Sequence, residues 1–361
     1  MLSPREAVRT LPSYHPPLGG REGLRLDFNE NTIGCSPRVL ERLRRLGPED
    51  LARYPERGPV EAIVADFLGI GPAELLLTNG VDEAIHLLCQ TYLEAGVEAL
   101  IVVPTYSMYR IYMMAAGAEV ISVVASGDFH FPSEDLRHRI TERTRLIAIA
   151  NPNNPTGTVA PPEELLRIAG SAPAAAVLVD EAYFEFCGQT LVTKFRELPN
   201  LFVTRTFSKA YGMAGLRVGV LIGDAGPMRA VRRASSPYNV NAVALACLPA
   251  ALADQGYVQQ YVRDVLQTRT RLERALEANG IPFWLSAANF VLARVGSSQA
   301  AAVFVEHMRR RGILVRDRSS DHGCEGCVRI TLGPSDHADR LLAALQETIE
   351  ELGATQEASR P

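Results

Sequence analysis

The stretch Leu201-Phe-Val-Thr-Arg-Thr-Phe-Ser-Lys-Ala-Tyr-Gly-Met-Ala-Gly-Leu-Arg-Val-Gly219 decides the fold that we expect of this chain. It begins with apolar, β-branched residues, changes to hydroxyl side chains, and delivers Lys209 just before a glycine-rich segment that carries Arg217. This order predicts a buried strand with a lysine at its end. A desolvated lysine loses its proton readily, as an amine must to form a Schiff base. The alternative is a lysine that extends from a strand end into water.

Length and composition narrow the class of protein. The chain has 361 residues, which exceeds the usual size of one hydrophobic core and predicts a large and a smaller domain. Its net charge is −4 and it has no basic tail, which argues against a nucleic-acid or membrane-surface protein. The N-terminus lacks an apolar signal core, and the apolar run 242–253 is shorter than the roughly 20 residues that span a bilayer. We therefore expect a cytoplasmic protein.

Apolar runs alternate with helical patterns through most of the chain. Near-continuous apolar runs of this length are typical of a mostly parallel α/β sheet whose two faces are covered by helices. The runs are 75–78, 100–103, 120–124, 146–150, 176–179, 201–203 and 218–222.

Polar and aromatic side chains follow four of these runs, at 104–106, 151–157, 180–183 and 208–209. In open α/β sheets, ligands bind beyond the carboxyl ends of the strands, so these segments are expected to meet in one crevice. The run 75–78 is followed by Asn79, Gly80 and a helical pattern. A turn and helix start of this kind offers backbone N–H groups and a helix dipole to an anion.

The last third of the chain reads as a second, α+β unit. We expect helices at 242–253, 255–279, 299–311 and 336–352, strands at 289–295, 313–315 and 328–331, and a frayed tail after 352. This predicts an N-terminal arm (1–35), a large domain (36–241), and a linking helix with a small domain (242–361). Cys324 and Cys327 have the spacing of half a zinc site, but no second pair accompanies them, so we expect free cysteines and no metal.

Several motifs, in this order and spacing, resemble those of the fold-type I, pyridoxal-phosphate-dependent aminotransferases, from about residue 24 to residue 352. The motifs are Asn154-Pro-Thr-Gly157, Asp180-Glu-Ala-Tyr183, and Ser208-Lys209 through Arg217. Within that family the chain is most similar to the histidinol-phosphate aminotransferases, through Asn29-Glu-Asn31, Arg53-Tyr-Pro55, and the segments 312–317 and 329–333. The resemblance implies a large domain with a mostly parallel seven-stranded sheet, a smaller C-terminal α+β domain, and transamination of histidinol phosphate in L-histidine biosynthesis.

The resemblance also implies three catalytic residues, Asp180, Tyr183 and Lys209, and their chemistry suits the cofactor. A buried carboxylate, Asp180, keeps the ring nitrogen of pyridoxal phosphate protonated. Tyr183 and Asn154 donate hydrogen bonds to the phenolic oxygen of the ring. Lys209 binds the cofactor aldehyde, is displaced by the substrate amine, and then moves a proton.

The cofactor phosphate needs backbone donors, hydroxyl groups and a cation. By resemblance these are Gly80, Val81, Asp82, Thr206, Ser208 and Arg217. Tyr106 is expected to stack on the cofactor ring. Tyr54 is similar to a tyrosine that reaches the cofactor phosphate of the neighbouring subunit, which implies a homodimer.

Two anionic substrates must share the pocket: an amino donor such as glutamate, and a phosphate ester of an amine. Because a bidentate guanidinium suits both anions, Arg329 and then Arg316 are the expected substrate-binding residues. Tyr14 resembles the tyrosine that contacts the substrate phosphate, and Asn31 belongs to the same expected site.

Other activities remain open at this point. The same fold and lysine support transamination of aromatic amino acids or decarboxylation, as in the threonine-phosphate decarboxylases. A nicotinamide-dependent dehydrogenase is disfavoured because the turn Gly69-Ile-Gly71-Pro-Ala-Glu74 lacks its third glycine. A phosphate-loop ATPase is disfavoured because the chain contains no Gly-Lys pair, and the N-terminus is too short for the DNA-binding domain of a regulator.

Overall fold

The expected apolar runs form one seven-stranded sheet in the computed structural model, which describes residues 2–11 and 22–358. Its strands are β2 (Leu75–Thr78), β3 (Glu98–Val103), β4 (Glu119–Val124), β5 (Thr144–Ala150), β6 (Ala176–Asp180), β7 (Leu201–Thr206) and β8 (Gly219–Gly223). They lie in the order β2-β8-β7-β6-β5-β3-β4. Strand β8 runs antiparallel to β2 and β7, and the other neighbours are parallel. The prediction of a mostly parallel seven-stranded α/β sheet is confirmed.

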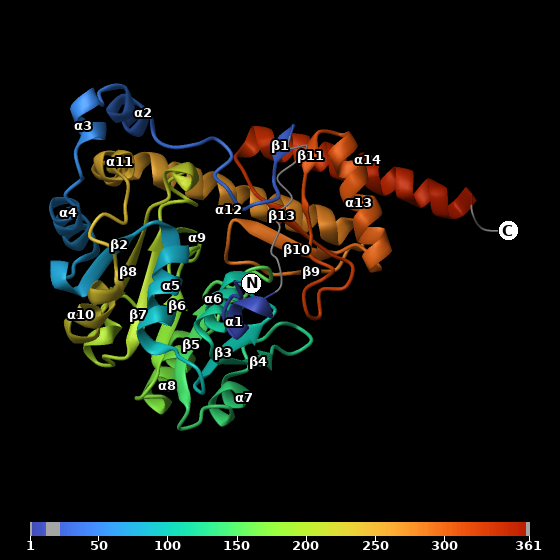
Figure 1. Cartoon of the computed structure of the whole chain (residues 1–361). Helices are drawn as coiled ribbons and strands as arrows, with labels where there is room; N and C mark the ends of the chain where they lie inside the picture. The colour runs from blue at the N-terminus through green and yellow to red at the C-terminus, as the bar shows by residue number, and fades with distance from the viewer. Residues whose placement is uncertain (1, 12–21, 359–361) are drawn as a thin grey trace.

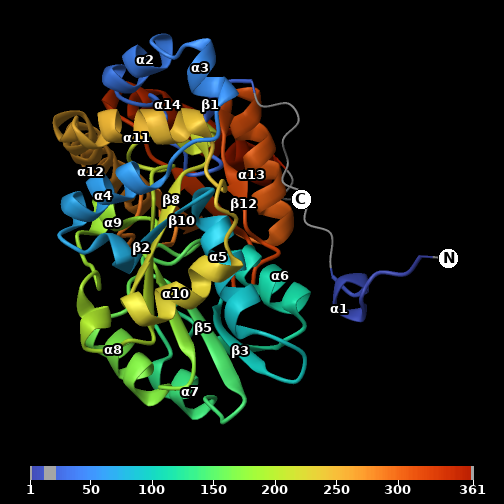
Figure 2. The ribbon, with the colours of Figure 1, turned by 60° about the vertical axis from the view of Figure 1, so that its left-hand side comes forward.

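Both faces of this sheet are buried, which explains why its strands read as continuous apolar runs. Leu178 and Phe202 point into a core shared with the helices of one face, and Val177 and Leu201 point into the core on the other face. The first face is covered by α5 (Gly80–Tyr92), α6 (Ser107–Ala116) and α10 (Ala225–Ala234). The second is covered mainly by α4 (Gly58–Leu68), α7 (Ser133–His138), α8 (Pro162–Ser171) and α11 (Ala242–Leu252) (Figures 1 and 2).

A four-stranded antiparallel sheet forms the second lobe, at the right of Figure 1. It contains β9 (Phe283–Trp284), β10 (Phe290–Arg294), β12 (Arg316–Asp317) and β13 (Cys327–Thr331). Beside it, β1 (Leu24–Arg25) pairs in parallel with β11 (Ile313–Leu314), which attaches the N-terminal segment to this lobe. Its helices are α12 (Gln255–Ala278), α13 (Ser298–Arg310) and α14 (Ser335–Ala358).

The remaining elements are short. They are α1 (Glu6–Arg9), α2 (Pro37–Arg44), α3 (Pro48–Ala52), α9 (Phe184–Cys187), and the 3-10 turns η1 (Pro72–Glu74), η2 (Lys194–Arg196) and η3 (Ala214–Leu216). The Ser36 hydroxyl accepts a hydrogen bond from the backbone N–H of Arg38, so Ser36 caps α2 and Pro37 opens it.

The structure differs from expectation at both ends of the chain. Helix α1, which we did not expect, lies beside α6, where the Arg5 guanidinium donates a 2.6 Å hydrogen bond to the Ala115 carbonyl. The prediction of a frayed tail after residue 352 is wrong, because α14 continues to Ala358. None of the helices that the structure describes is both long and apolar enough to cross a membrane.

Candidate active site

A cavity of about 490 Å³ lies beyond the carboxyl ends of β5, β6 and β7, between the two lobes. The strand-end segments therefore meet, as the sheet rule predicted. Twelve of the residues expected at the site line this cavity: Val81, Asp82, Tyr106, Asn154, Asp180, Tyr183, Thr206, Ser208, Lys209, Arg217, Arg316 and Arg329.

Lys209 follows β7 and turns its side chain into the cavity. Its Nζ donates a 3.1 Å hydrogen bond to the Phe28 carbonyl and lies 5.9 Å from the centre of the Tyr183 ring. Burial, reinforced by the positive charge of Arg329, lowers the pKa of Lys209 from 10.5 to about 8. The amine is therefore neutral far more often than a surface lysine.

Asp180 is the last residue of β6 and is only 5% exposed. The Tyr109 hydroxyl donates a 2.6 Å hydrogen bond to Oδ2, and the Thr204 hydroxyl donates a 2.9 Å bond to Oδ1. Burial raises the pKa of Asp180, and these two hydrogen bonds oppose that shift. The carboxyl group is thus held in one orientation inside the protein.

The sequence analysis missed both partners of Asp180, although each leaves a signal. Thr204 directly follows three apolar residues in a strand that is buried throughout, and it pairs in register with Asp180. Tyr109 lies one helical turn after Tyr106, so the two rings meet edge to face with centres 5.7 Å apart.

A tight turn at the start of α5 brings backbone N–H groups to one end of the cavity. Gly80 has φ +74°, a left-handed conformation that favours glycine, and a Cβ there would lie 2.6 Å from Nη2 of Arg217. The same guanidinium lies 3.1 Å from the Asp82 carboxylate, which also accepts a 2.9 Å hydrogen bond from the Tyr106 hydroxyl. This end combines a helix N-terminus with a cation, which suits a phosphate group.

The opposite end is lined by three arginines, of which Arg318 was not predicted. The Arg329 guanidinium is buried; its Nη1 donates a 2.6 Å hydrogen bond to Asn154 Oδ1, and its Nη2 donates a 2.6 Å bond to the Asp27 carbonyl. Burial, reinforced by the charge of Arg318, lowers the pKa of Arg329 to about 10. Arg316 lies over the Phe28 ring, 5.5 Å from its centre.

Tyr183 stands between these ends. Burial raises the pKa of its hydroxyl, and the charge of Arg329 opposes that shift. The hydroxyl accepts a 2.9 Å hydrogen bond from the side-chain amide of Asn29, a residue to which the sequence analysis gave no role. The sequence could not indicate this contact because the two residues are 154 positions apart.

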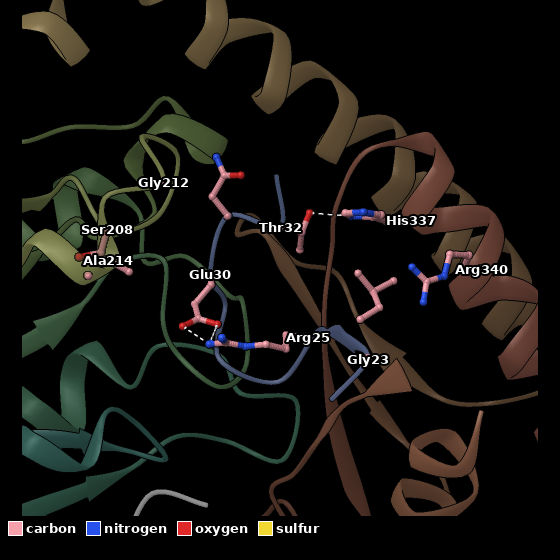
Figure 3. A pocket seen from close by; sticks show the side chains of 12 residues that line it. Gly23, Arg25, Glu30, Thr32, Ser208, Gly212, Ala214, His337 and Arg340 are labelled. Carbon is pink, nitrogen blue, oxygen red and sulfur yellow. Dashed lines mark hydrogen bonds and ion pairs between the residues drawn. The ribbon is translucent and has the colours of Figure 1, made fainter. Parts of the chain in front are cut away.

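Of the expected residues that the structure describes, Gly80, Asn31 and Tyr54 do not line this cavity. Asn31 lines a neighbouring cavity of about 380 Å³, which lies between the arm and α14 and is drawn in Figure 3. Its amide donates to the Ala210 carbonyl at 3.0 Å, and its side-chain oxygen closes a turn onto Ile33 and Gly34. Tyr54 is 78% exposed and stacks on Tyr238 with ring centres 4.4 Å apart. Tyr14 lies outside the described residues.

Within residues 2–11 and 22–358, no three His, Cys, Asp or Glu side chains gather in a way that would hold a metal ion. Cys324 and Cys327 are buried free thiols beside Phe129 and Leu292.

Residues 21–345 match the sequence model of the aminotransferases of class I and II. The chain belongs to this family. Curated relatives of the aminotransferase include histidinol-phosphate aminotransferases from Paracoccus denitrificans (36% identity over 91% of this chain and 90% of the relative) and from a Geobacillus species (34% over 95% and 97%). Among solved structures, histidinol-phosphate aminotransferase from Sinorhizobium meliloti in complex with pyridoxal 5'-phosphate has a TM-score of 0.88 and 27% identity over 96% of this chain and 98% of that structure. The expected fold-type I architecture is thereby confirmed.

Proposed function

We propose that this aminotransferase uses pyridoxal 5'-phosphate for the reversible transamination between histidinol phosphate and 2-oxoglutarate. In L-histidine biosynthesis glutamate gives its amino group to the ketone that corresponds to histidinol phosphate, and the products are histidinol phosphate and 2-oxoglutarate. The observation that carries the proposal is one cavity that holds a buried lysine and aspartate at its centre and three arginines at one end. Relatives with 36% and 34% identity over nearly the whole chain are histidinol-phosphate aminotransferases.

The residues present fit this cofactor. A Cβ at Gly80 would fill the turn beside Arg217, so the turn is open to the cofactor phosphate through backbone N–H groups. We assign the phosphate to this turn, Thr206, Ser208 and Arg217, and the ring nitrogen to Asp180. The cofactor aldehyde and ring, when bound, supply a carbonyl for the amine and a sink for electrons. We assign the face of the ring to Tyr106.

The chain's own residues position and move protons. We propose that the Lys209 amine, with its lowered pKa, would hold the cofactor through its aldehyde and, once the substrate amine takes its place, would carry the proton taken from the substrate carbon. The hydroxyl of Tyr183 and the amide of Asn154 would donate to the phenolic oxygen. Arg329 already binds Asn154 Oδ1, so the Asn154 amide is left to face the ring.

Both substrates bring an anion to the arginine end. No described residue accepts a hydrogen bond from the buried Nε of Arg329, which suits an incoming carboxylate of glutamate or 2-oxoglutarate. We assign the phosphate of histidinol phosphate to Arg316, with Arg318 adding positive charge, and to Tyr14.

We further propose a cytoplasmic homodimer in which Tyr54 reaches the cofactor phosphate of the partner subunit, and in which Asn31 lies beside the substrate entrance. Large exposed apolar side chains gather on α2, α3 and α4 and beside them: Leu40, Leu51, Tyr54, Ile63, Phe67 and Tyr238. An exposed apolar surface of this kind is typical of a protein interface. The arm 1–35, the large domain 36–241 and the unit 242–361 are the proposed domains, and each of the two larger sheets lies within one of the last two.

The test measures single half-reactions of the holoenzyme by the absorbance change of its cofactor, with histidinol phosphate, phenylalanine and threonine phosphate as separate amino donors. We expect the largest kcat/KM for histidinol phosphate. A wide preference for phenylalanine would remove the histidine-pathway substrate, and release of carbon dioxide from threonine phosphate would show a decarboxylase instead.

A further inference from the structure

A closed set of hydrogen bonds lies behind the Tyr183 hydroxyl and joins it to β13. The backbone N–H of Asn29 donates to Thr331 Oγ1 at 3.0 Å. The Thr331 hydroxyl donates to Asn29 Oδ1 at 3.0 Å. The Asn29 Nδ2 group then donates to the Tyr183 hydroxyl at 2.9 Å. We call these three residues the Asn29 chain.

The orientation of the Asn29 amide gives every proton in the Asn29 chain a direction. A backbone N–H can only donate, so Thr331 Oγ1 is an acceptor on that side and has one proton left to give. In the structure that proton goes to Asn29 Oδ1, and the NH₂ group faces Tyr183. The tyrosine oxygen is therefore an acceptor toward Asn29.

One consequence concerns the single proton of the Tyr183 hydroxyl. Since Asn29 occupies an acceptor position of the oxygen, the proton must point elsewhere. No described residue accepts it, and Tyr183 lines the large cavity. The proton is thus directed into the cavity before any ligand arrives.

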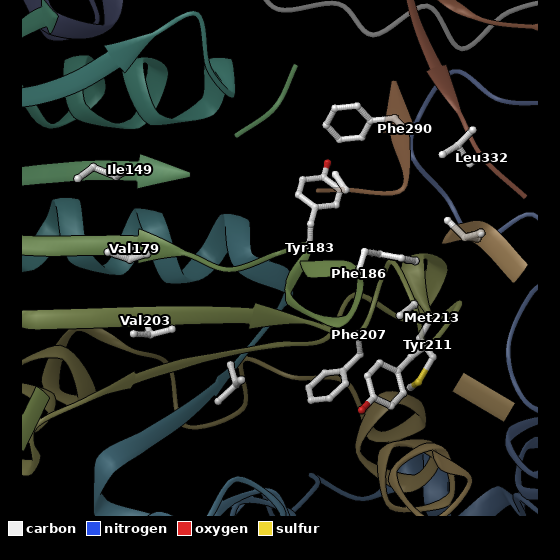
Figure 4. Close-up of a cluster of buried hydrophobic side chains, with 14 of the residues drawn as sticks. Ile149, Val179, Tyr183, Phe186, Val203, Phe207, Tyr211, Met213, Phe290 and Leu332 are labelled. Atoms are coloured by element: carbon white, nitrogen blue, oxygen red, sulfur yellow. The ribbon is translucent and has the colours of Figure 1, made fainter. Parts of the chain in front are cut away.

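The surroundings keep the Asn29 chain from rearranging. Asn29 is 1% exposed and has φ +54°, a left-handed conformation that Asn and Asp tolerate better than other side chains with a Cβ. Asn289 donates a 3.2 Å hydrogen bond to its carbonyl. The Tyr183 ring packs edge-on against Phe290 (Figure 4). The ring centres are 5.2 Å apart and the planes are at 81°.

Charged groups of three elements influence the Tyr183 hydroxyl. Arg329 on β13 and Arg318 after β12 favour its ionisation, and Asp180 on β6 opposes it. Burial outweighs them and raises the pKa of Tyr183, so the hydroxyl keeps its proton near neutral pH. The Lys209 amine lies 5.9 Å from the centre of the ring.

We propose that Asn29 and Thr331 are positioning residues that orient the Tyr183 proton toward the phenolic oxygen of bound pyridoxal phosphate. This inference rests on the proposed function. A hydrogen bond to that oxygen favours its ionised form, so the Asn29 chain lowers the pH at which the bound cofactor changes its absorbance.

The test is an absorbance pH titration of the purified holoenzyme without substrate. Asn29→Asp keeps the shape and the tolerance for positive φ, but it replaces the donor with an acceptor that draws the Tyr183 proton away from the cavity. We expect the midpoint to rise by roughly one pH unit, the size of one hydrogen bond lost to an ionised group. Thr331→Val, which removes the hydroxyl, should raise it in the same direction, and Thr331→Ser, which keeps the hydroxyl, should titrate as the wild type.

Tyr183→Phe sets the full size of the effect, and Asn29→Asp should add nothing when Tyr183 is already replaced. If Asn29→Asp and Thr331→Val both bind the cofactor with the wild-type midpoint, the inference is overturned while the proposed function stands. A wild type that binds no pyridoxal phosphate would overturn both. If Asn29→Asp fails to fold, the matched pair at Thr331 decides the question.

Discussion

Covalent capture of pyridoxal phosphate by the apoprotein should become fast near pH 8, well below the pH at which a surface lysine reacts. Burial and the charge of Arg329 lower the pKa of Lys209 from 10.5 to about 8. At pH 7 roughly a tenth of such amines are neutral, against roughly 0.03% at the ordinary value, which is a ratio on the order of 300. Only the neutral amine attacks an aldehyde, so at pH 7 the capture rate of Lys209 should exceed that of an ordinary lysine by the same ratio.

The assay mixes apoprotein with excess cofactor and follows absorbance between about pH 6 and about pH 10, a range that brackets the lowered pKa. The same measurement on a free, blocked lysine corrects for ionisation of the cofactor itself. We expect the protein's rate to level off above pH 8 and the blocked lysine's rate to keep rising. Lys209→Arg, which keeps the positive charge, should capture nothing.

A protein rate that rises about tenfold per pH unit without levelling off, as for the free amine, would refute the reasoning. It would mean that Lys209 extends into water, the alternative that the motif alone left open.

Three further changes follow from the contacts at the site and behind it. Arg329→Lys should raise the KM of glutamate and of 2-oxoglutarate by roughly 10- to 100-fold, because an ammonium cannot reproduce the two fixed hydrogen bonds of the guanidinium and bind a carboxylate as well; steady-state kinetics check this. Gly80→Ala should weaken cofactor binding because its Cβ meets Arg217, whereas Gly127→Ala, where nothing lies within 4 Å, should leave binding unchanged in an equilibrium titration. Arg205→Met should lower the free energy of unfolding, measured in urea, by about 3–5 kcal/mol, because Glu181 stays buried without the guanidinium that now lies 2.7 Å away. The double variant Arg205→Met, Glu181→Leu should recover most of this loss.

The positions of Lys209 and Asp180 could be predicted because the strand patterns and motifs that indicate them lie in neighbouring residues of the chain. Lys209 and Asp180 could be placed at strand ends from their own neighbours, and the sheet rule then brought them together. The role of Asn29 could not be predicted in this way. Its hydrogen bonds with Thr331 join residues 302 positions apart, and no local sequence pattern indicates such a pairing. Arg318 follows a strand of only two residues, β12, which is too short to leave a periodic signal.

The hydrogen bond from Arg329 to the Asp27 carbonyl has a consequence for how the protein matures. These residues are 302 positions apart, and both line the cavity. A nascent chain still missing β13 already contains every strand of the seven-stranded sheet, Lys209 and the turn at Gly80, yet it lacks the arginine that fixes Asn154. The residues proposed to hold the cofactor are therefore synthesised before the arginine proposed to select a carboxylate.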